Sequence, residues 1–265
     1  MGSSFIFDKS LFNYHPPSLG AGFFFLFFVS FASSTPPTFT AAANNEKQVE
    51  ALLAWKSSLE DRSQSQLSSW HGNNSCNFVG VTCDDYGSIT HLNLSYLGLR
   101  GTLDGLNFSC LTNLLSLDFS NNWLYGSIPS SIGSLSKLNY LDLCKNEPYG
   151  NIPPSTGKLK NLHSLYLCGN YLSGHISLEI GDLKSLKILY LWGNRLSGPI
   201  PSEIGRLTSI LELLLSINNL SGSIPPSIGN LTNPIPAEIG KLVSLRLLDL
   251  SDNSLSGQSL PQLEA

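Results

Sequence analysis

The side chains that most often carry chemistry are few and scattered in this sequence. Its five histidines do not show the spacing of a metal site or of a nucleophile–base pair, and they are His15, His71, His91, His163 and His175. Asp118 and Asp142 stand at equivalent places in a repeat, and paired carboxylates perform acid–base catalysis in glycosidases. Because repeats place identical positions side by side, we interpret these two as a solvated face. We predict no catalytic residue, no metal and no cofactor.

A leucine pattern with a period of 24 residues organises most of the chain. Its copies begin at Leu114, Leu138, Leu162, Leu186 and Ile210, with further copies at Leu245 and, more loosely, at Ile89. The best copy has the skeleton Leu186, Leu189, Leu191, Asn194, Leu196, Gly198, Ile200 and Pro201. A fixed period in the twenties with this spacing is the signature of leucine-rich repeats.

The alternation within each copy predicts one short strand per repeat. Leu189 and Leu191 alternate with Tyr190 and Trp192, as in a half-buried strand. Successive strands are expected to lie in parallel, with the leucines stacked inward, because a single repeat cannot bury its apolar face alone. The predicted fold is therefore a leucine-rich-repeat solenoid, a horseshoe or superhelix with parallel strands on its concave face.

A recurring asparagine marks the corner where the chain leaves each strand. Backbone groups lose their ladder partners there, and an asparagine side chain can both donate to them and accept from them. We expect a structural column of Asn122, Asn146, Asn170, Asn194, Asn218 and Asn253. Gly198 permits a left-handed backbone after the corner, and Pro201 fixes the returning segment.

The tail of the repeat resembles a known family. Leu-Ser-Gly-x-Ile-Pro, as in residues 196–201, is similar to the plant-type leucine-rich repeat in the ectodomains of receptor-like kinases and receptor-like proteins. The resemblance covers roughly residues 46–260. It implies an extracellular protein-interaction module that binds a peptide ligand or a co-receptor on its concave face.

Residues 44–88 are expected to form the N-terminal cap of the solenoid. Asn45 and Gln48 match a capping box, and Val49, Leu52 and Trp55 give one apolar face of a helix. The segment Cys76–Cys83 resembles the plant cap motif C-x-W-x-G-V-x-C, with Phe78 where the family usually has tryptophan. The resemblance and an exported location favour a Cys76–Cys83 disulfide over a metal site.

The N-terminal residues predict export. Residues 1–35 contain a phenylalanine-rich run of signal-peptide length, with cleavage after Ser34 or as late as residue 43, and an uncleaved anchor is the alternative. Glycosylation triplets occur at Asn73, Asn107, Asn219 and Asn230, and at Asn93 on the concave face. The formal charge of −4 without a basic run argues against nucleic acid. We expect a secreted protein of the apoplast or the outer face of the plasma membrane.

The predicted solenoid covers residues 89–260 and has seven strands. One of its repeats is irregular. In residues 210–244 about half a repeat is missing, because Asn230–Asn233 run straight into the tail-like Pro234–Pro236. We predict that the strand near Leu248 pairs directly with the strand near Leu213, while residues 225–243 bulge away. After a short tail of residues 261–265 the chain stops, which suggests a fragment or a shortened gene product.

The outward side chains of the strands are the best candidate binding surface. We assign ligand binding to Tyr140, Asp142, Tyr166, Tyr190 and Trp192, because exposed aromatic side chains are enriched at binding sites. Stacking on carbohydrate and simple shielding of the strands are the alternatives. Cys144 and Cys168 hold one position on adjacent strands, roughly 4.8 Å apart, so the distance allows a disulfide. We expect unpaired thiols, because side chains that point the same way would strain the bridge. Cys110 has no evident partner.

Three functions compete at this stage. The first is a receptor-type module that binds a peptide or protein and a receptor-kinase co-receptor, with membrane association only through a partner or a missing C-terminal span. The second is a secreted protein similar to the polygalacturonase inhibitors, although the acidic and aromatic face disfavours it. The third is a truncated fragment of a receptor kinase, since kinase activity would require a gene product that extends past Ala265.

Overall fold

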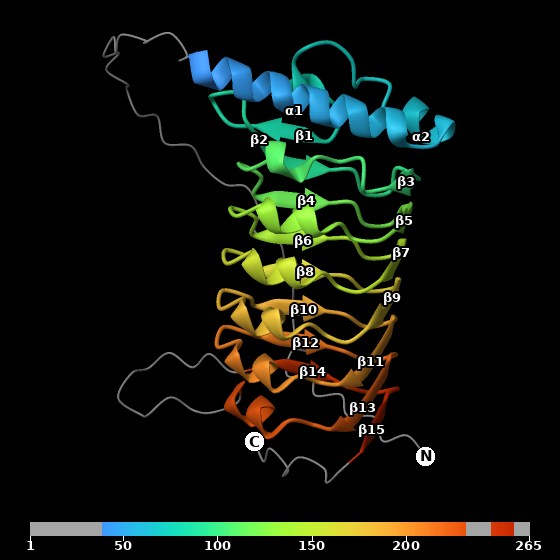
Figure 1. The fold of residues 1–265 in the computed structure, drawn as a ribbon, viewed down its shortest axis with the longest axis vertical. Coiled ribbons are helices and arrows are strands. Elements are labelled where there is room, and N and C mark those ends of the chain that lie inside the picture. Colours follow the sequence, from blue (N-terminus) through green and yellow to red (C-terminus); the bar gives the residue numbers. More distant parts are fainter. Residues whose placement is uncertain (1–38, 232–244, 257–265) are drawn as a thin grey trace, which may run out of the picture.

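Two parallel sheets run the length of an elongated stack (Figure 1). The computed structural model describes residues 39–231 and 245–256. The predicted signal segment, the C-terminal tail and most of the predicted bulge lie outside these residues. In the described ranges, no helix combines the length and apolar character that a bilayer span requires.

The first sheet lines the concave face and contains the predicted strands. Its order is β1-β2-β4-β6-β8-β10-β12-β14, in which only β1 is antiparallel to its neighbour. The strands are β1 (Val81–Cys83), β2 (Ile89–Asn93), β4 (Ser116–Asp118), β6 (Tyr140–Asp142), β8 (Ser164–Tyr166), β10 (Ile188–Tyr190), β12 (Glu212–Leu214) and β14 (Leu247–Asp249).

The second sheet is formed by the segments that we interpreted as turns. Its order is β15-β13-β11-β9-β7-β5-β3, and we call its strand row the lateral edge. The strands are β3 (Arg100–Thr102), β5 (Trp123–Gly126), β7 (Glu147–Gly150), β9 (Tyr171–Gly174), β11 (Arg195–Pro199), β13 (Asn219–Ser223) and β15 (Ser254–Ser256). The left-handed backbone expected at Gly198 is present, with φ of 73°.

Short 3₁₀ turns cover the face opposite the first sheet. They are η1 (Ser75–Asn77), η2 (Phe108–Cys110), η3 (Ser130–Ser134), η4 (Pro154–Lys158), η5 (Leu178–Asp182), η6 (Ser202–Arg206) and η7 (Pro226–Leu231). A glycine in each of η3 to η6 lets the next turn approach closely. A Cβ on Gly181, for example, would lie 2.4 Å from the backbone oxygen of Glu203.

The inward leucines form one continuous core between the sheets and the 3₁₀ turns. Leu165, Leu189 and Leu213 are fully buried and are register partners on consecutive strands. This arrangement is the predicted inward stack, and it makes each turn depend on its neighbours for burial of apolar surface.

The cap helix closes the first turn of the stack, as predicted. Helix α1 (Phe39–Ser58) is followed by α2 (Asp61–Gln66), and Trp55 of α1 stacks on Phe119 at a centroid distance of 5.1 Å. The Trp55 Nε1–H donates to the Thr102 carbonyl oxygen at 2.9 Å. Phe78 stacks on Trp70 at 5.5 Å, so it packs in the cap core where the family motif has tryptophan.

The predicted capping box is wrong, because α1 begins at Phe39 and places Asn45 inside the helix. The alanines that precede Asn45 are strong helix formers and extend the helix toward the N-terminus. The two polar residues instead tie the helix to the rest of the cap. The Ser75 hydroxyl donates to Asn45 at 3.2 Å, and the Ile89 N–H donates to Gln48 at 3.0 Å.

The asparagine column joins each turn to both of its neighbours. The Asn170 Nδ2 donates to the carbonyl oxygens of Leu143 at 3.0 Å and Leu167 at 2.9 Å. Its Oδ1 accepts the N–H of Asn146 at 2.9 Å. The other members also donate to the two equivalent carbonyl oxygens, but the Oδ1 of each accepts the N–H of a leucine in the preceding turn; they are Asn122, Asn146, Asn194, Asn218 and Asn253.

The stack continues across the irregular repeat. Leu213 of β12 is the register partner of Leu248 of β14, which confirms the predicted direct pairing. The Asn253 side chain spans the same boundary and donates to the Leu215 carbonyl oxygen at 3.0 Å. The solenoid therefore keeps its strand and asparagine ladders although the intervening chain has an irregular length.

Candidate functional site

The candidate site is the outward surface of the first sheet, which we call the concave face. Two positions of each strand point outward from it, one on each side of the inward leucine. They place Tyr140, Tyr166 and Tyr190 on three consecutive strands, β6, β8 and β10.

These three tyrosines contact one another and form a ladder. The Tyr140 and Tyr166 rings are 5.5 Å apart and tilted, and the Tyr166 and Tyr190 rings are 5.0 Å apart in an edge-on arrangement. We expected exposed aromatic rings, but all three are half-buried because each covers part of its neighbour. The ladder is consequently a row of contacting rings that remains partly accessible to solvent.

Carboxylates hold both ends of the tyrosine ladder. The Tyr140 hydroxyl donates to Asp142 Oδ2 at 3.2 Å, and the Tyr190 hydroxyl donates to Glu212. The Cys144 N–H also donates to Asp142 Oδ1 at 2.8 Å. Sequence reasoning missed Glu212, although it occupies the outward column of Tyr140 and Ile188 and is recognisable there from the repeat register.

Burial and nearby negative charge raise the pKa values of the ladder tyrosines. Burial, followed by the charge of Asp142, raises the pKa of Tyr140, and burial with the hydrogen bond to Glu212 raises the pKa of Tyr190. Burial also raises the pKa of the Asp142 carboxyl. The tyrosines thus remain neutral hydrogen-bonding groups, and the face carries the carboxylates of Asp118, Asp142, Glu212 and Asp249.

The remaining predicted residue, Trp192, lies just beyond the end of β10 and is half-buried. It shares its column with two cysteines. We predicted that these two are free thiols, and that prediction is wrong. Cys144 and Cys168 form a disulfide across adjacent turns, with Cα atoms 4.6 Å apart. Side chains that point the same way from such close strands still reach each other. The cap disulfide Cys76–Cys83 is present as predicted, and Cys110 is free.

The raised pKa of Asp142 leads to a pH-dependent prediction. A carboxyl whose pKa is raised in the folded state favours folding at low pH, and that contribution is lost as pH rises through the folded-state pKa. Asp142→Asn should therefore raise the melting temperature near pH 7, by roughly 1–2 °C, and leave it unchanged near pH 3. Thermal unfolding followed by circular dichroism checks this, with exposed Asp104→Asn as the control. A lower melting temperature near pH 7 would contradict it.

Comparison with known proteins agrees with the repeat register. The family model of the leucine rich repeat N-terminal domain matches residues 45–84. The leucine rich repeat model matches residues 113–135, 161–183, 185–207, 209–231 and 244–265. Neither model describes a catalytic domain.

The similar curated proteins include plant receptor-like kinases. MDIS1-interacting receptor like kinase 2 of Arabidopsis thaliana is 41% identical over 103 residues, which cover 37% of this chain and 10% of that protein. The chain spans about a tenth of the length of the first curated relatives that it matches.

Solved structures extend the likeness to three dimensions. A complex of PEPR1 with AtPEP1 is 35% identical with a TM-score of 0.72, and the match covers 79% of this chain and 28% of that one. The BIR2 ectodomain from Arabidopsis thaliana is 36% identical with a TM-score of 0.55, over 60% of this chain and 86% of that one. With its cap, its repeats and its structural neighbours in agreement, this chain belongs to the leucine-rich-repeat receptor family of plants and has the fold of their ectodomains.

Proposed function

We propose that this protein is an extracellular recognition module whose concave face binds a peptide. The observation that carries the proposal is the ladder of Tyr140, Tyr166 and Tyr190 with Asp142 and Glu212 at its ends. Tyrosine supplies a large contact area at low conformational cost, and it is enriched in binding hot spots. A ladder already fixed by its own contacts loses little freedom when a ligand docks.

The charge of the face indicates the kind of peptide. Four carboxylates lie on the outward positions of the first sheet, at Asp118, Asp142, Glu212 and Asp249. Complementary charge favours a partner with lysine or arginine side chains. We therefore propose a cationic peptide that lies across β6, β8, β10 and β12, with its basic side chains toward Asp142 and Glu212.

The relatives support a second partner and a location outside the cell. One similar structure is the PEPR1–AtPEP1 complex, and another is the BIR3–SERK2 complex, with 38% identity and a TM-score of 0.56. We propose that this chain likewise meets a receptor-kinase co-receptor. Its two disulfides fit an oxidising compartment. Asn73, Asn107 and Asn219 are exposed and are proposed glycosylation sites together with Asn230, whose side chain lies outside the described residues.

The test is selection from a pooled library of synthetic dodecapeptides on the immobilised full chain. Enriched peptides should contain lysine or arginine, and Tyr166→Ala should weaken their binding about 30-fold, a loss typical of a central hot spot. Tyr149→Ala is the matched control, because this exposed tyrosine lies on β7 of the other sheet. Enrichment of acidic peptides, or equal binding by the Tyr166→Ala variant, would refute the proposal.

A further inference from the structure

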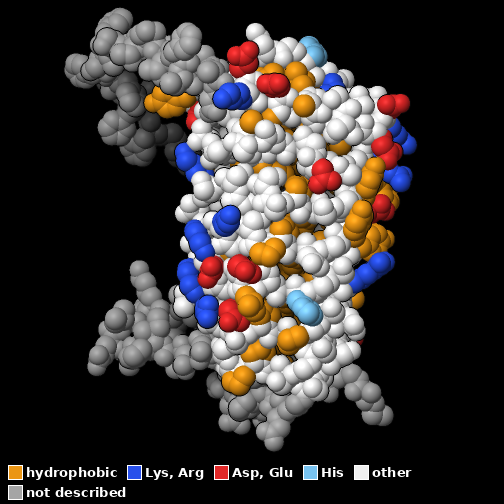
Figure 2. Space-filling view, in the orientation of Figure 1, with side chains coloured by type: hydrophobic (Ala, Val, Ile, Leu, Met, Phe, Trp, Pro, Cys, Tyr) orange, Lys and Arg blue, Asp and Glu red, His pale blue; other side chains and the backbone are white. Residues whose placement is uncertain are grey.

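A second aromatic surface follows the lateral edge, away from the concave face. Exposed rings there belong to Tyr96, Trp123, Tyr149 and Tyr171, of which Trp123 is 58% exposed. Figure 2 shows hydrophobic and charged side chains gathered along this margin, over β3 to β11. The core does not require large rings at these positions, because the buried leucines of each turn are separate residues. An exposed row of this kind marks a binding surface.

Two adjoining hollows of about 400 Å³ each divide this edge, and Trp123 lines both. We call their combined surface the lateral groove. The hollow beside the cap is bordered by Arg62, Gln66 and Arg100. The farther hollow is bordered by Tyr96, Lys145, Glu147 and Tyr171. The groove thus runs across the strands, from α2 to β9.

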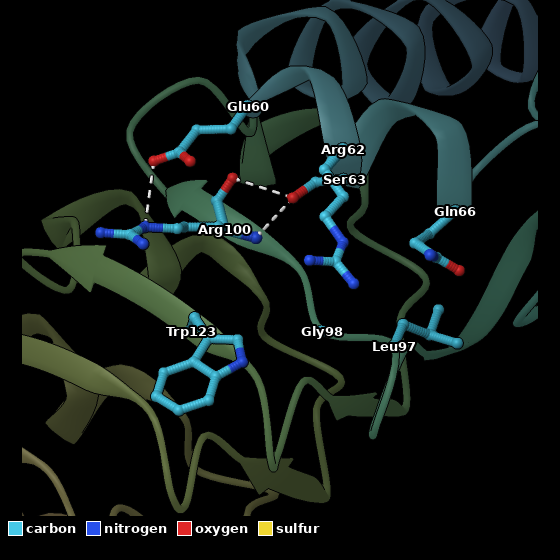
Figure 3. Close-up of a pocket in the computed structure, with 8 residues that line it drawn as sticks. All are labelled: Glu60, Arg62, Ser63, Gln66, Leu97, Gly98, Arg100 and Trp123. Carbon is cyan, nitrogen blue, oxygen red and sulfur yellow. Dashed lines mark hydrogen bonds and ion pairs between the residues drawn. The ribbon is translucent and has the colours of Figure 1, made fainter.

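The hollow beside the cap presents a cation opposite an aromatic ring. Figure 3 shows the Arg62 and Gln66 side chains extending from α2, with the Trp123 indole across the same space. Arg100 is paired with Glu60 at 3.1 Å, whereas Arg62 has no ion-pair partner in the described part of the chain. Its guanidinium is available to a ligand and can form a bidentate contact with a carboxylate.

In the farther hollow, the position of the Tyr171 ring is partly fixed by a neighbouring side chain. The Arg195 guanidinium lies over the Tyr171 ring, 4.6 Å from its centroid, and Arg195 does not line the hollow. The guanidinium therefore covers one face of the ring, and Tyr171 still lines the hollow. Trp123 on β5 and Tyr171 on β9 are separated by β7, which is about 10 Å at two strand spacings.

This arrangement suits a saccharide chain. Flat aromatic faces stack on the C–H faces of sugar rings, and the polar side chains of Lys145, Glu147 and Gln66 can bond to sugar hydroxyls. The spacing of the two rings allows alternate sugar units of an extended chain to stack on Trp123 and Tyr171. A peptide would find fewer partners, because β5, β7 and β9 are each paired on both sides and leave no edge for strand addition.

The charges of the groove specify the sugar further. Its lining has the three cations Arg62, Arg100 and Lys145 against the two carboxylates Glu60 and Glu147, in a chain with a formal net charge of −4. We propose that the lateral groove binds an oligosaccharide that carries carboxylate groups. Its rings stack on Trp123 and Tyr171, and one carboxylate pairs with Arg62.

Calorimetric titration of the full chain with hexagalacturonic acid tests this proposal. The acid should bind, and Trp123→Ala should weaken binding at least about ten-fold because a stacking face is lost. Arg62→Gln should weaken it about ten-fold, and the methyl-esterified hexamer should bind the parent protein about ten-fold more weakly, because each removes the ion pair.

The controls separate this groove from the concave face and from general charge effects. Tyr86→Ala should leave binding unchanged, because this exposed tyrosine lies between β1 and β2 and lines neither hollow. Arg206→Gln removes the same charge at η6 and should also leave binding unchanged. Tyr166→Ala should also bind the acid normally, so failure here is distinguishable from failure of the peptide proposal. No binding, equal binding by Trp123→Ala, or equal binding of hexaglutamate would overturn the inference.

Discussion

Replacing Asn170 with alanine is expected to lower the free energy of unfolding by about 3 kcal/mol. The change leaves the buried N–H of Asn146 without its acceptor, and an unpaired buried donor is costly. The carbonyl oxygens of Leu143 and Leu167 each lose one of their two amide donors. Each keeps the other, because Asn146 still donates to Leu143 and Asn194 still donates to Leu167. The loss is therefore below that of three fully orphaned groups.

Urea unfolding measures this effect, with Asn161→Ala as its control. Asn161 is an exposed asparagine whose Nδ2 makes a hydrogen bond to Ser136 at 2.8 Å on the far side of the turn. Its replacement should cost below about 1 kcal/mol. If the two variants were equally stable, the asparagine column would not be what joins the turns.

The double change Cys144→Ser and Cys168→Ser is expected to lower stability by about 3.5 kcal/mol in the chain-entropy relation. The bridge closes a loop with a sequence separation of 24, so its loss frees a large set of unfolded conformations. The bridge Cys76–Cys83, with a separation of 7, should contribute less, about 2.5 kcal/mol in the same relation.

Unfolding in guanidinium without reductant measures both costs, and thiol labelling after denaturation checks the pairing itself. The structure leaves one of the five cysteines free, Cys110, so one label per chain is expected. Three labels per chain would show that one bridge is absent, and peptide mapping of the labels would say whether it is Cys144–Cys168.

The repetitive part of the fold could be predicted because one pattern is repeated. Each strand leucine, such as Leu189, has register partners in the turns before and after it, so one correct repeat fixes its neighbours. The same logic predicted the direct pairing of Leu213 with Leu248, since half a repeat cannot complete a circuit.

The errors arose where the neighbours of a side chain in space, more than its position in the repeat, determine its exposure and contacts. The tyrosine ladder looked exposed from alternation alone, but Tyr166 is covered by Tyr140 and Tyr190 on the next strands. The cysteines show the same limit, because a bridge between side chains that point the same way was judged too strained although the two strands lie close enough for it. The start of α1 depended on alanines that carry no apolar periodicity.

The lateral groove was missed for a different reason. Trp123 and Tyr171 follow the column residues Asn122 and Asn170, and Arg195 follows Asn194, so their register was visible in the sequence. The segment after each asparagine was interpreted as a turn, and a second sheet was not considered. Without that sheet the rings had no common surface on which to lie.

The direction of the hydrogen bonds also determines how the molecule would respond to being pulled. Bonds between successive strands of both sheets lie along the long axis of the stack (Figure 1). Tension between the two ends would therefore separate the interfaces between consecutive repeats one after another, and each step would release one repeat. The boundary between β6 and β8 is crossed by the Cys144–Cys168 bridge, so the chain between these two cysteines would stay closed as a loop and could not lengthen until the bridge was reduced.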